Sequence, residues 1–146
     1  MLEVLLGWAL PHRVIDGADG SPYLTRYTIV DLGSQIGRLY LHRFHRGDED
    51  RELHSHPWRA ISLILSGGYR EERLDRDGVV RVRSYAPGAV NTISPSTFHR
   101  VDLINNEAWT LIAVGPVVGS WGFWDRETDE FTPWREFIAR KFARPA

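Results

Sequence analysis

Residues 47–67 read GDEDRELHSHPWRAISLILSG, and this stretch decides how the rest of the chain is interpreted. At its centre, His54 and His56 are separated by a single residue. On an extended strand, residues i and i+2 project from the same face, so both imidazoles are expected to point to one side. Two imidazoles on one face are a ready pair of ligands for Zn, Fe, Ni or Mn. A His-x-His pair alone also occurs on solvated strands, so the surrounding sequence has to decide.

A second stretch, residues 88–99, reads GAVNTISPSTFH and supplies a third histidine, His99. The turn-rich residues before it could aim this side chain inward. Together the two stretches resemble the two sequence motifs of the cupin superfamily, G(X)5HXH(X)3–4E(X)6G and G(X)5PXGXXH(X)3N. The resemblance implies a double-stranded β-helix, or jelly-roll barrel, that gathers His54, His56 and His99 around one divalent metal ion. The string from Leu41 through Tyr69 also resembles small, largely uncharacterised cupin-like proteins of bacteria and phages.

The chain departs from these motifs at several positions. Gly47 lies one residue too far from His54, and the motif glutamate is replaced by Ala60. In the second motif, three residues replace the usual proline, glycine and asparagine: Ser94, Ser96 and Leu103. Without the glutamate, the implied ligands are three neutral imidazoles, which resembles the three-histidine site of thiol dioxygenases and some diketone-cleaving cupins. The chain has no cysteine, so the cysteine–tyrosine crosslink of some thiol dioxygenases is excluded.

The remaining pattern is that of an all-β protein. Short β-branched and aromatic runs recur about every ten residues between Gly, Pro, Asp or Asn, which indicates a sandwich or a barrel. Sharp turns are expected at Ser66–Gly68 and at Asp75–Gly78. The predicted strands are Tyr23–Val30, Gly37–His45, Ala60–Leu65, Gly68–Leu74, Val79–Tyr85, Ala89–Ile93, His99–Leu103, Trp109–Val114 and Trp121–Trp124.

The C-terminal segment predicts a helix over about 132–143. Thr132 is a suitable N-cap and Pro133 suits a first turn. An apolar stripe at helical spacing then ends at Phe142, so the helix is expected to pack outside the barrel. We interpret the whole chain, 1–146, as a single cupin domain with its barrel over about 22–125.

Composition narrows the partners. The chain has 146 residues with 18 basic and 19 acidic side chains, a net charge of −1, which gives no reason to expect nucleic acid or a membrane surface. The apolar segment Met1–Leu10 is too short and too acidic for a signal peptide or a membrane span, and is expected to pack on the core. We expect a cytoplasmic protein that binds a small-molecule substrate or ligand, with a homodimer as a plausible assembly.

Several further residues are candidates for the site. Trp58, Tyr69 and Trp109 are possible pocket walls, although ordinary core packing is at least as plausible for each. His42 is a possible fourth ligand, and its odd spacing from His45 places these two histidines on opposite faces. Two loop acids, Asp50 and Glu52, could supply the missing carboxylate, but a solvated charged loop is the simpler interpretation. Two arginines that flank the histidines in sequence, Arg59 and Arg100, are expected to face solvent.

Three functions remain open from the sequence. The leading hypothesis is a mononuclear non-haem iron dioxygenase that acts on a small chelating molecule, with Fe(II) favoured and Zn, Ni or Mn as possible metals. The second is a metal-dependent isomerase, lyase or hydrolase, for which His42 or Tyr69 is the best available general base. The third is a cupin that binds a ligand or has a structural role without catalysis. A metal-free epimerase is less attractive, because the sequence does not reveal the histidine–aspartate pair that it needs.

Overall fold

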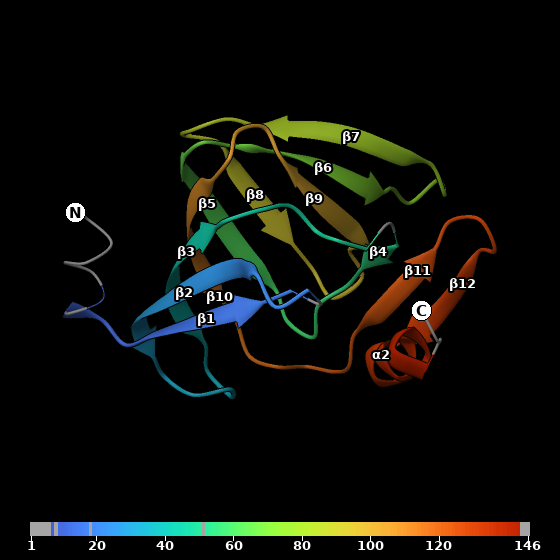
Figure 1. Cartoon of the computed structure of the whole chain (residues 1–146), viewed down its shortest axis with the longest axis horizontal. Helices are drawn as coiled ribbons and strands as arrows, with labels where there is room; N and C mark the ends of the chain where they lie inside the picture. The colour runs from blue at the N-terminus through green and yellow to red at the C-terminus, as the bar shows by residue number, and fades with distance from the viewer. Residues whose placement is uncertain (1–6, 8, 18, 51, 144–146) are drawn as a thin grey trace.

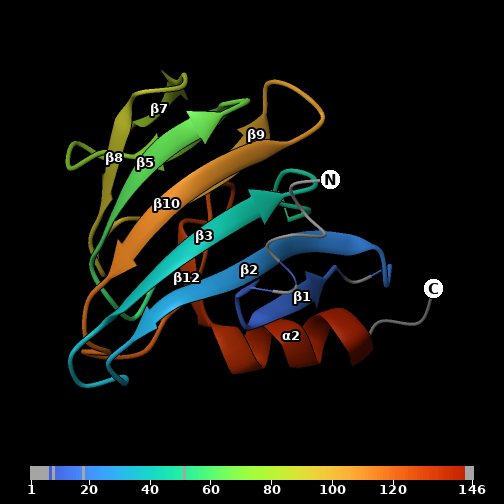
Figure 2. The same cartoon turned by 90° about the vertical axis from the view of Figure 1, so that its left-hand side faces the viewer.

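The computed structural model describes residues 7, 9–17, 19–50 and 52–143, and two antiparallel sheets dominate it (Figure 1). One sheet has the strand order β1-β2-β3-β10-β5-β8, and the other has the order β12-β11-β4-β9-β6-β7. Figure 2 shows the first sheet in front of strands of the second. The strands are β1 His12–Asp16, β2 Pro22–Asp31, β3 Arg38–Phe44, β4 Leu53–His54, β5 Ala60–Ser66, β6 Tyr69–Leu74, β7 Val80–Tyr85, β8 Val90–Ile93, β9 His99–Leu103, β10 Ala108–Val114, β11 Gly122–Asp125 and β12 Glu130–Pro133.

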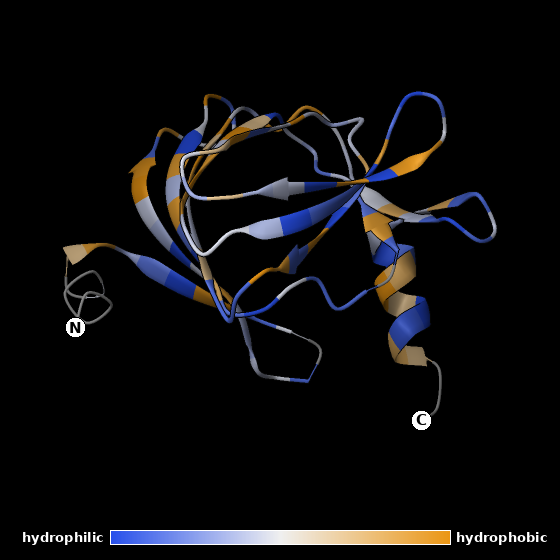
Figure 3. Ribbon diagram, turned by 90° about the horizontal axis from the view of Figure 1, so that it is seen from above, coloured by the Kyte–Doolittle hydropathy of each residue, from blue (hydrophilic) through white to orange (hydrophobic). Residues whose placement is uncertain are grey.

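Strand alternation defines the interior between the two sheets. Along β5, Ala60 and Ile64 are buried, whereas Ile61 between them is 58% exposed. Ala60 packs with Ile93 of β8 and with apolar side chains of β10, because burying apolar surface on one face of each strand removes it from water. The same alternation is visible as changing colour along the strands in Figure 3. The all-β jelly-roll architecture predicted from the sequence is confirmed.

The tight turns also follow the sequence. Gly67 and Gly68 have φ angles of 75° and 109°, in the region that glycine adopts without steric cost. A Cβ at Gly67 would lie 2.1 Å from the carbonyl oxygen of Glu107, so this position also requires close backbone approach. Gly78 closes the hairpin between β6 and β7 with a φ of 77° and donates its N–H to Asp75 O.

The C-terminal helix, α2 Trp134–Ala143, begins later than predicted. Thr132 and Pro133 belong to β12, where they pair with Phe123 and Gly122 of β11, so the ladder takes the residues expected to cap the helix. The helix contacts β11 and β12 on the outside, as expected (Figures 1 and 2). Phe142 is 69% exposed and does not continue the packed stripe.

Three short strands were not predicted, namely β1, β4 and β12. Each is short or polar, as in the HRVID of β1, and is held by pairing with a neighbour rather than by its own apolar pattern. The predicted core-packing segment Met1–Leu10 lies largely outside the described residues. Among the described residues, the helices are too short and too polar to cross a membrane.

Candidate metal centre

His54 and His56 are held on one side of their segment by the residue between them. The short strand β4 ends at His54, which is paired with Phe123 on one side and with His99 on the other. Beyond it, the backbone N–H of Ser55 donates to Gly122 O at 2.9 Å, and the N–H of Gly122 donates to Ser55 Oγ at 3.2 Å. Ser55 is therefore attached to β11, and its two histidine neighbours project away from it toward a common point.

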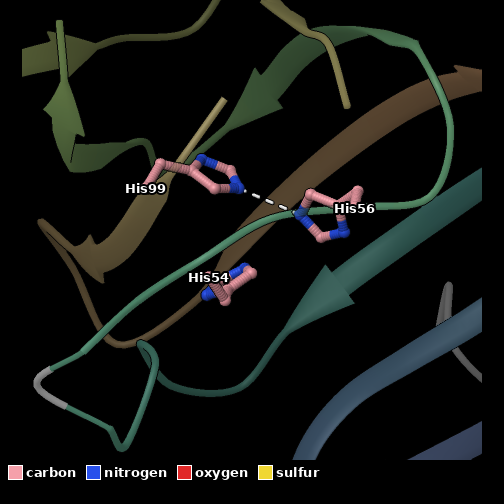
Figure 4. Close-up of side chains that lie close together, drawn as sticks. All are labelled: His54, His56 and His99. Carbon is pink, nitrogen blue, oxygen red and sulfur yellow. Dashed lines mark hydrogen bonds between the residues drawn. The ribbon is translucent and has the colours of Figure 1, made fainter. Parts of the chain in front are cut away.

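His99 reaches the same point from β9. The ring centroids of His54 and His99 are 4.8 Å apart, and those of His54 and His56 are 4.9 Å apart. One ring nitrogen from each of the three histidines lies within 4.8 Å of the other two. Figure 4 shows the three rings together, with a contact of 2.9 Å between the Nε2 atoms of His56 and His99. The structure thus brings together all three histidines singled out in the sequence.

The spacing of the nitrogens suits a shared metal ion. Two nitrogens bound at right angles, each about 2.1 Å from an ion, are about 3.0 Å apart, and at the tetrahedral angle they are about 3.4 Å apart. The observed 2.9 Å between His56 and His99 matches the right-angled case. Three nitrogens on one face of an ion at right angles leave the opposite face for other ligands. The donor set, and the spacing of the His56–His99 pair, therefore fit a divalent metal.

No protein-family model matches the chain, and neither does any curated protein. Solved structures do. A cupin-2 domain protein from Rhodospirillum rubrum superposes with a TM-score of 0.60 at 14% identity, over 92% of this chain and 82% of that one. The chain has the cupin fold.

Two larger cupin-fold proteins also match. Oxalate decarboxylase from Bacillus subtilis gives a TM-score of 0.56 at 17% identity over 93% of this chain, and Fe(II) HppE gives 0.55 at 13% identity over 70%. The chain spans 35% of the decarboxylase chain and 56% of the HppE chain. At these identities the likeness concerns the fold, and the chemistry has to be argued from the side chains.

A fully buried carboxylate, which the sequence analysis missed, orients His99. Glu71 of β6 is 0% exposed, and its Oε1 lies 2.6 Å from His99 Nδ1. The same oxygen accepts hydrogen bonds from Arg73 at 2.9 Å and from Asn91 at 3.1 Å. Burial would raise the pKa of Glu71, but the hydrogen bonds from His99 and Arg73 outweigh it and hold that pKa at about 2. An ionised carboxylate only accepts, so His99 donates from Nδ1 to Glu71.

The other two histidines are held neutral, as metal ligation requires. Burial lowers the pKa of His54 to about 4, although the nearby Asp48 carboxylate opposes this shift. Burial, reinforced by His54 and His99, lowers the pKa of His56 well below its usual value. One of the two rings donates a proton to the other in the contact between His56 and His99. A metal ion would displace that proton and take its place between the rings.

Asp48 is the loop carboxylate that faces the cluster. Its Oδ2 lies 3.8 Å from His54 Nδ1 and accepts from the backbone N–H of Val101 at 2.6 Å. Its Oδ1 accepts from Tyr23 Oη at 2.6 Å. Asp50, which was considered for this role, instead pairs with Lys141 of α2 at 2.6 Å.

The structure separates the four residues suggested as pocket walls or as a fourth ligand. Trp58 stacks on His56 with ring centroids 4.2 Å apart and so covers one ligand. Tyr69 is buried inside the barrel, where its hydroxyl accepts from Asn91 at 3.1 Å. Trp109 lies on the outer face, opposite the buried neighbours Ala108 and Thr110, and stacks on Tyr27, because the alternation of β10 turns it away from the interior.

His42 faces the interior but stands apart from the three-histidine cluster. Its Nε2 accepts a hydrogen bond from Arg26 Nε at 3.1 Å, which occupies the lone pair that a metal would need. His45 lies on the opposite face of β3 beside Thr25, in agreement with the predicted odd spacing. Of the two flanking arginines, Arg59 is exposed as expected. Arg100 does not simply face solvent, because its side chain is only 24% exposed and contacts Glu72 and the backbone oxygen of Asp48.

The motif position of the missing glutamate lies in an apolar setting. Ala60 is 4% exposed, and Trp58 packs against the apolar cluster that Ala60 forms. A pocket of about 810 Å³ opens beside this cluster at the ends of β5, β6, β8 and β10. Its wall includes Arg73, which also bonds Glu71, whereas none of the three clustered histidines lines it.

Proposed function

We propose that this protein binds one divalent metal ion through His54, His56 and His99. With iron(II) as that ion, it acts as a mononuclear non-haem iron dioxygenase. The observation that carries the proposal is the convergence of three imidazoles, two of them with Nε2 atoms 2.9 Å apart. Iron(II) is favoured because an all-imidazole set suits a first-row transition metal and leaves positions open for both a chelating substrate and oxygen. Bound iron would supply the redox chemistry that the protein's own side chains lack.

The side chains around the cluster have separate tasks in this proposal. Glu71 fixes the tautomer and the ring orientation of His99, as carboxylates behind metal-binding histidines do. Ser55 fixes the backbone between the other two ligands, and Trp58 shields one face of His56 from water. The substrate would be a small molecule with two donor atoms that replace water at the ion.

Metal content and oxygen consumption test this proposal. Purified protein should retain about one iron per chain when prepared anaerobically with Fe(II), and His99→Ala should lose it while keeping its β-sheet circular dichroism. His12→Ala is the matched control, since His12 lies in β1 at the sheet edge and should leave metal content unchanged. Iron-loaded protein that consumes no oxygen with any of a panel of chelating acids, diketones and thiols would refute the dioxygenase.

A metal-free function has one specific observation in its favour. The 2.6 Å contact between His99 and the buried Glu71 is a histidine–carboxylate pair, which the sequence did not reveal and which can serve in general acid–base catalysis. An isomerase or epimerase of this kind would work equally well in the presence of a strong chelator. If the protein retains zinc or nickel and does not depend on iron, a Lewis-acid isomerase or lyase is favoured instead. If the protein is well folded and binds no metal, a ligand-binding role is favoured.

A further inference from the structure

Arg26 is an arginine on the interior face of the barrel, and the sequence analysis did not single it out. It lies on β2 directly opposite His42 of β3, and His42 is in turn opposite Thr110 of β10. Thr110 is 1% exposed and continues the inward-facing row of β10. Paired residues of neighbouring strands project from the same face, so Arg26 projects into the barrel.

The guanidinium of Arg26 has no carboxylate partner among the described residues. Its recorded contacts are the hydrogen bond from Nε to His42 Nε2 and a position 4.6 Å from the ring centroid of Tyr40. Neither contact is with a carboxylate, and burial keeps His42 neutral by lowering its pKa to about 3. A partly buried, unpaired cation is costly, and burial accordingly lowers the pKa of Arg26 itself.

Other partly buried arginines of the same sheets are compensated. Arg73 bonds Glu71 at 2.9 Å, and Arg43, on the outer face of β3, bonds Glu107 at 2.8 Å. Arg26 is therefore unusual in keeping its terminal nitrogens without an acid. Such a group is expected where the compensating anion arrives with a ligand.

The surroundings connect Arg26 to the three-histidine cluster. Tyr40, beneath the guanidinium, and Trp58, stacked on His56, both pack against the same apolar cluster around Ala60. Arg26 and the histidines thus line one interior.

We propose that Arg26 binds the carboxylate of a small chelating acid whose other donor atoms occupy the metal, so that the substrate class of this cupin is anionic. This inference rests on the proposed metal site. The free Nη atoms of the guanidinium would grip the carboxylate while Nε remains on His42. A dication on three neutral ligands and an unpaired guanidinium both attract negative charge, so the interior selects an acid over a neutral chelator.

Paired hydroxamates test this assignment. Acetohydroxamate and carboxylated hydroxamates with spacers of one to three carbons bind a metal through the same two oxygens, and only the latter carry a free carboxylate. With Co(II)-loaded protein and visible absorption as the readout, the best carboxylated probe should bind more tightly than acetohydroxamate. Arg26→Met should weaken the carboxylated probe by about 10- to 100-fold and leave acetohydroxamate unchanged. Arg59→Met, at an exposed position, is the matched control and should change neither.

The outcomes separate this inference from the metal site. If Arg26→Met binds both probes as the wild type does, the inference is wrong although the metal site stands. Loss of cobalt by Arg26→Met would also overturn it, because the residue would then act on the site and not on the ligand. Should that variant not fold, Arg26→Lys, which keeps the charge but loses the two-pronged donor, must still reduce the preference for the carboxylated probe. If no metal binds at all, titrating metal-free protein with glutarate while following the Arg26 Nε–H NMR resonance decides the matter independently.

Discussion

The charge on Glu71 should control metal affinity although Glu71 does not need to touch the metal. Glu71→Gln keeps the size of the side chain and an oxygen that can accept from His99 Nδ1, but removes the charge from a group that is 0% exposed. The 2.6 Å contact makes the imidazole a stronger donor toward a metal, and losing such an outer partner costs about 10- to 100-fold in affinity. This corresponds to about 1.4–2.7 kcal/mol. Glu71→Ala, which also frees the ring to rotate, should lose more.

The assay is a competition titration of Zn(II) or Co(II) against a chromophoric chelator at pH 7. Glu72→Gln is the matched control, because Glu72 is the next residue on β6 and pairs with Arg100 and Arg126 rather than with a histidine. Its metal affinity should equal that of the wild type. A Glu71→Gln dissociation constant within twofold of the wild type would refute the claim that this carboxylate tunes the site. Circular dichroism on both variants ensures that only folded protein is compared.

Three further outcomes are expected from metal-free protein. Burial lowers the pKa of His42 to about 3 and that of His54 to about 4. As the pH falls below about 6.5, these histidines become protonated in the unfolded chain before they do so in the folded protein, and the free energy of unfolding falls. Each histidine should lower that free energy by about 2 kcal/mol at pH 5. Urea unfolding at pH 7 and pH 5 measures this, and equal midpoints would contradict the assignment. Ala60→Glu should lower the free energy of unfolding by about 3–5 kcal/mol, because it buries a charge. If metal raises the melting temperature of this variant more than that of the wild type, position 60 reaches the ion. Ser55→Ala should cost about 1–3 kcal/mol because the N–H of Gly122 loses its buried acceptor, as thermal melting would record.

The fold was predictable because its strands carry their own signal. Runs such as residues 60–66 alternate or are continuously apolar, and glycine marks the reversals at 67–68 and 78. Strands β1 and β12 were missed because their sequences are polar and their order comes from neighbours in the sheet. The helix start was misplaced for the same reason, since Thr132 and Pro133 suit a helix N-terminus locally but are taken by a ladder with β11.

The site was predictable only as far as sequence spacing could carry it. The three histidines stand in motif-like positions, whereas Glu71 and Arg26 lie in strands outside the motifs. In β6, however, Tyr69, Glu71 and Arg73 are alternate residues, which face the same side of a strand. If the aromatic side chain of Tyr69 faces the interior, the two charged side chains must face it too. Such same-parity charges on a core-facing row are the signal that could have found both residues. Which of these charged side chains has an oppositely charged partner depends on the pairing between strands, which the sequence does not reveal.

The position of the carboxylate changes the chemistry expected of the centre. A glutamate at position 60 could cancel one charge of a bound dication directly, but Ala60 leaves that charge in place. Glu71 does not substitute for it in charge, because its negative charge is already shared with Arg73 at 2.9 Å. Asp48, 3.8 Å from His54, is held by Tyr23 and a backbone amide and compensates only in part. With a dication bound to the three histidines, the unpaired Arg26 would leave a net positive interior, and an acidic substrate would bring the missing negative charge.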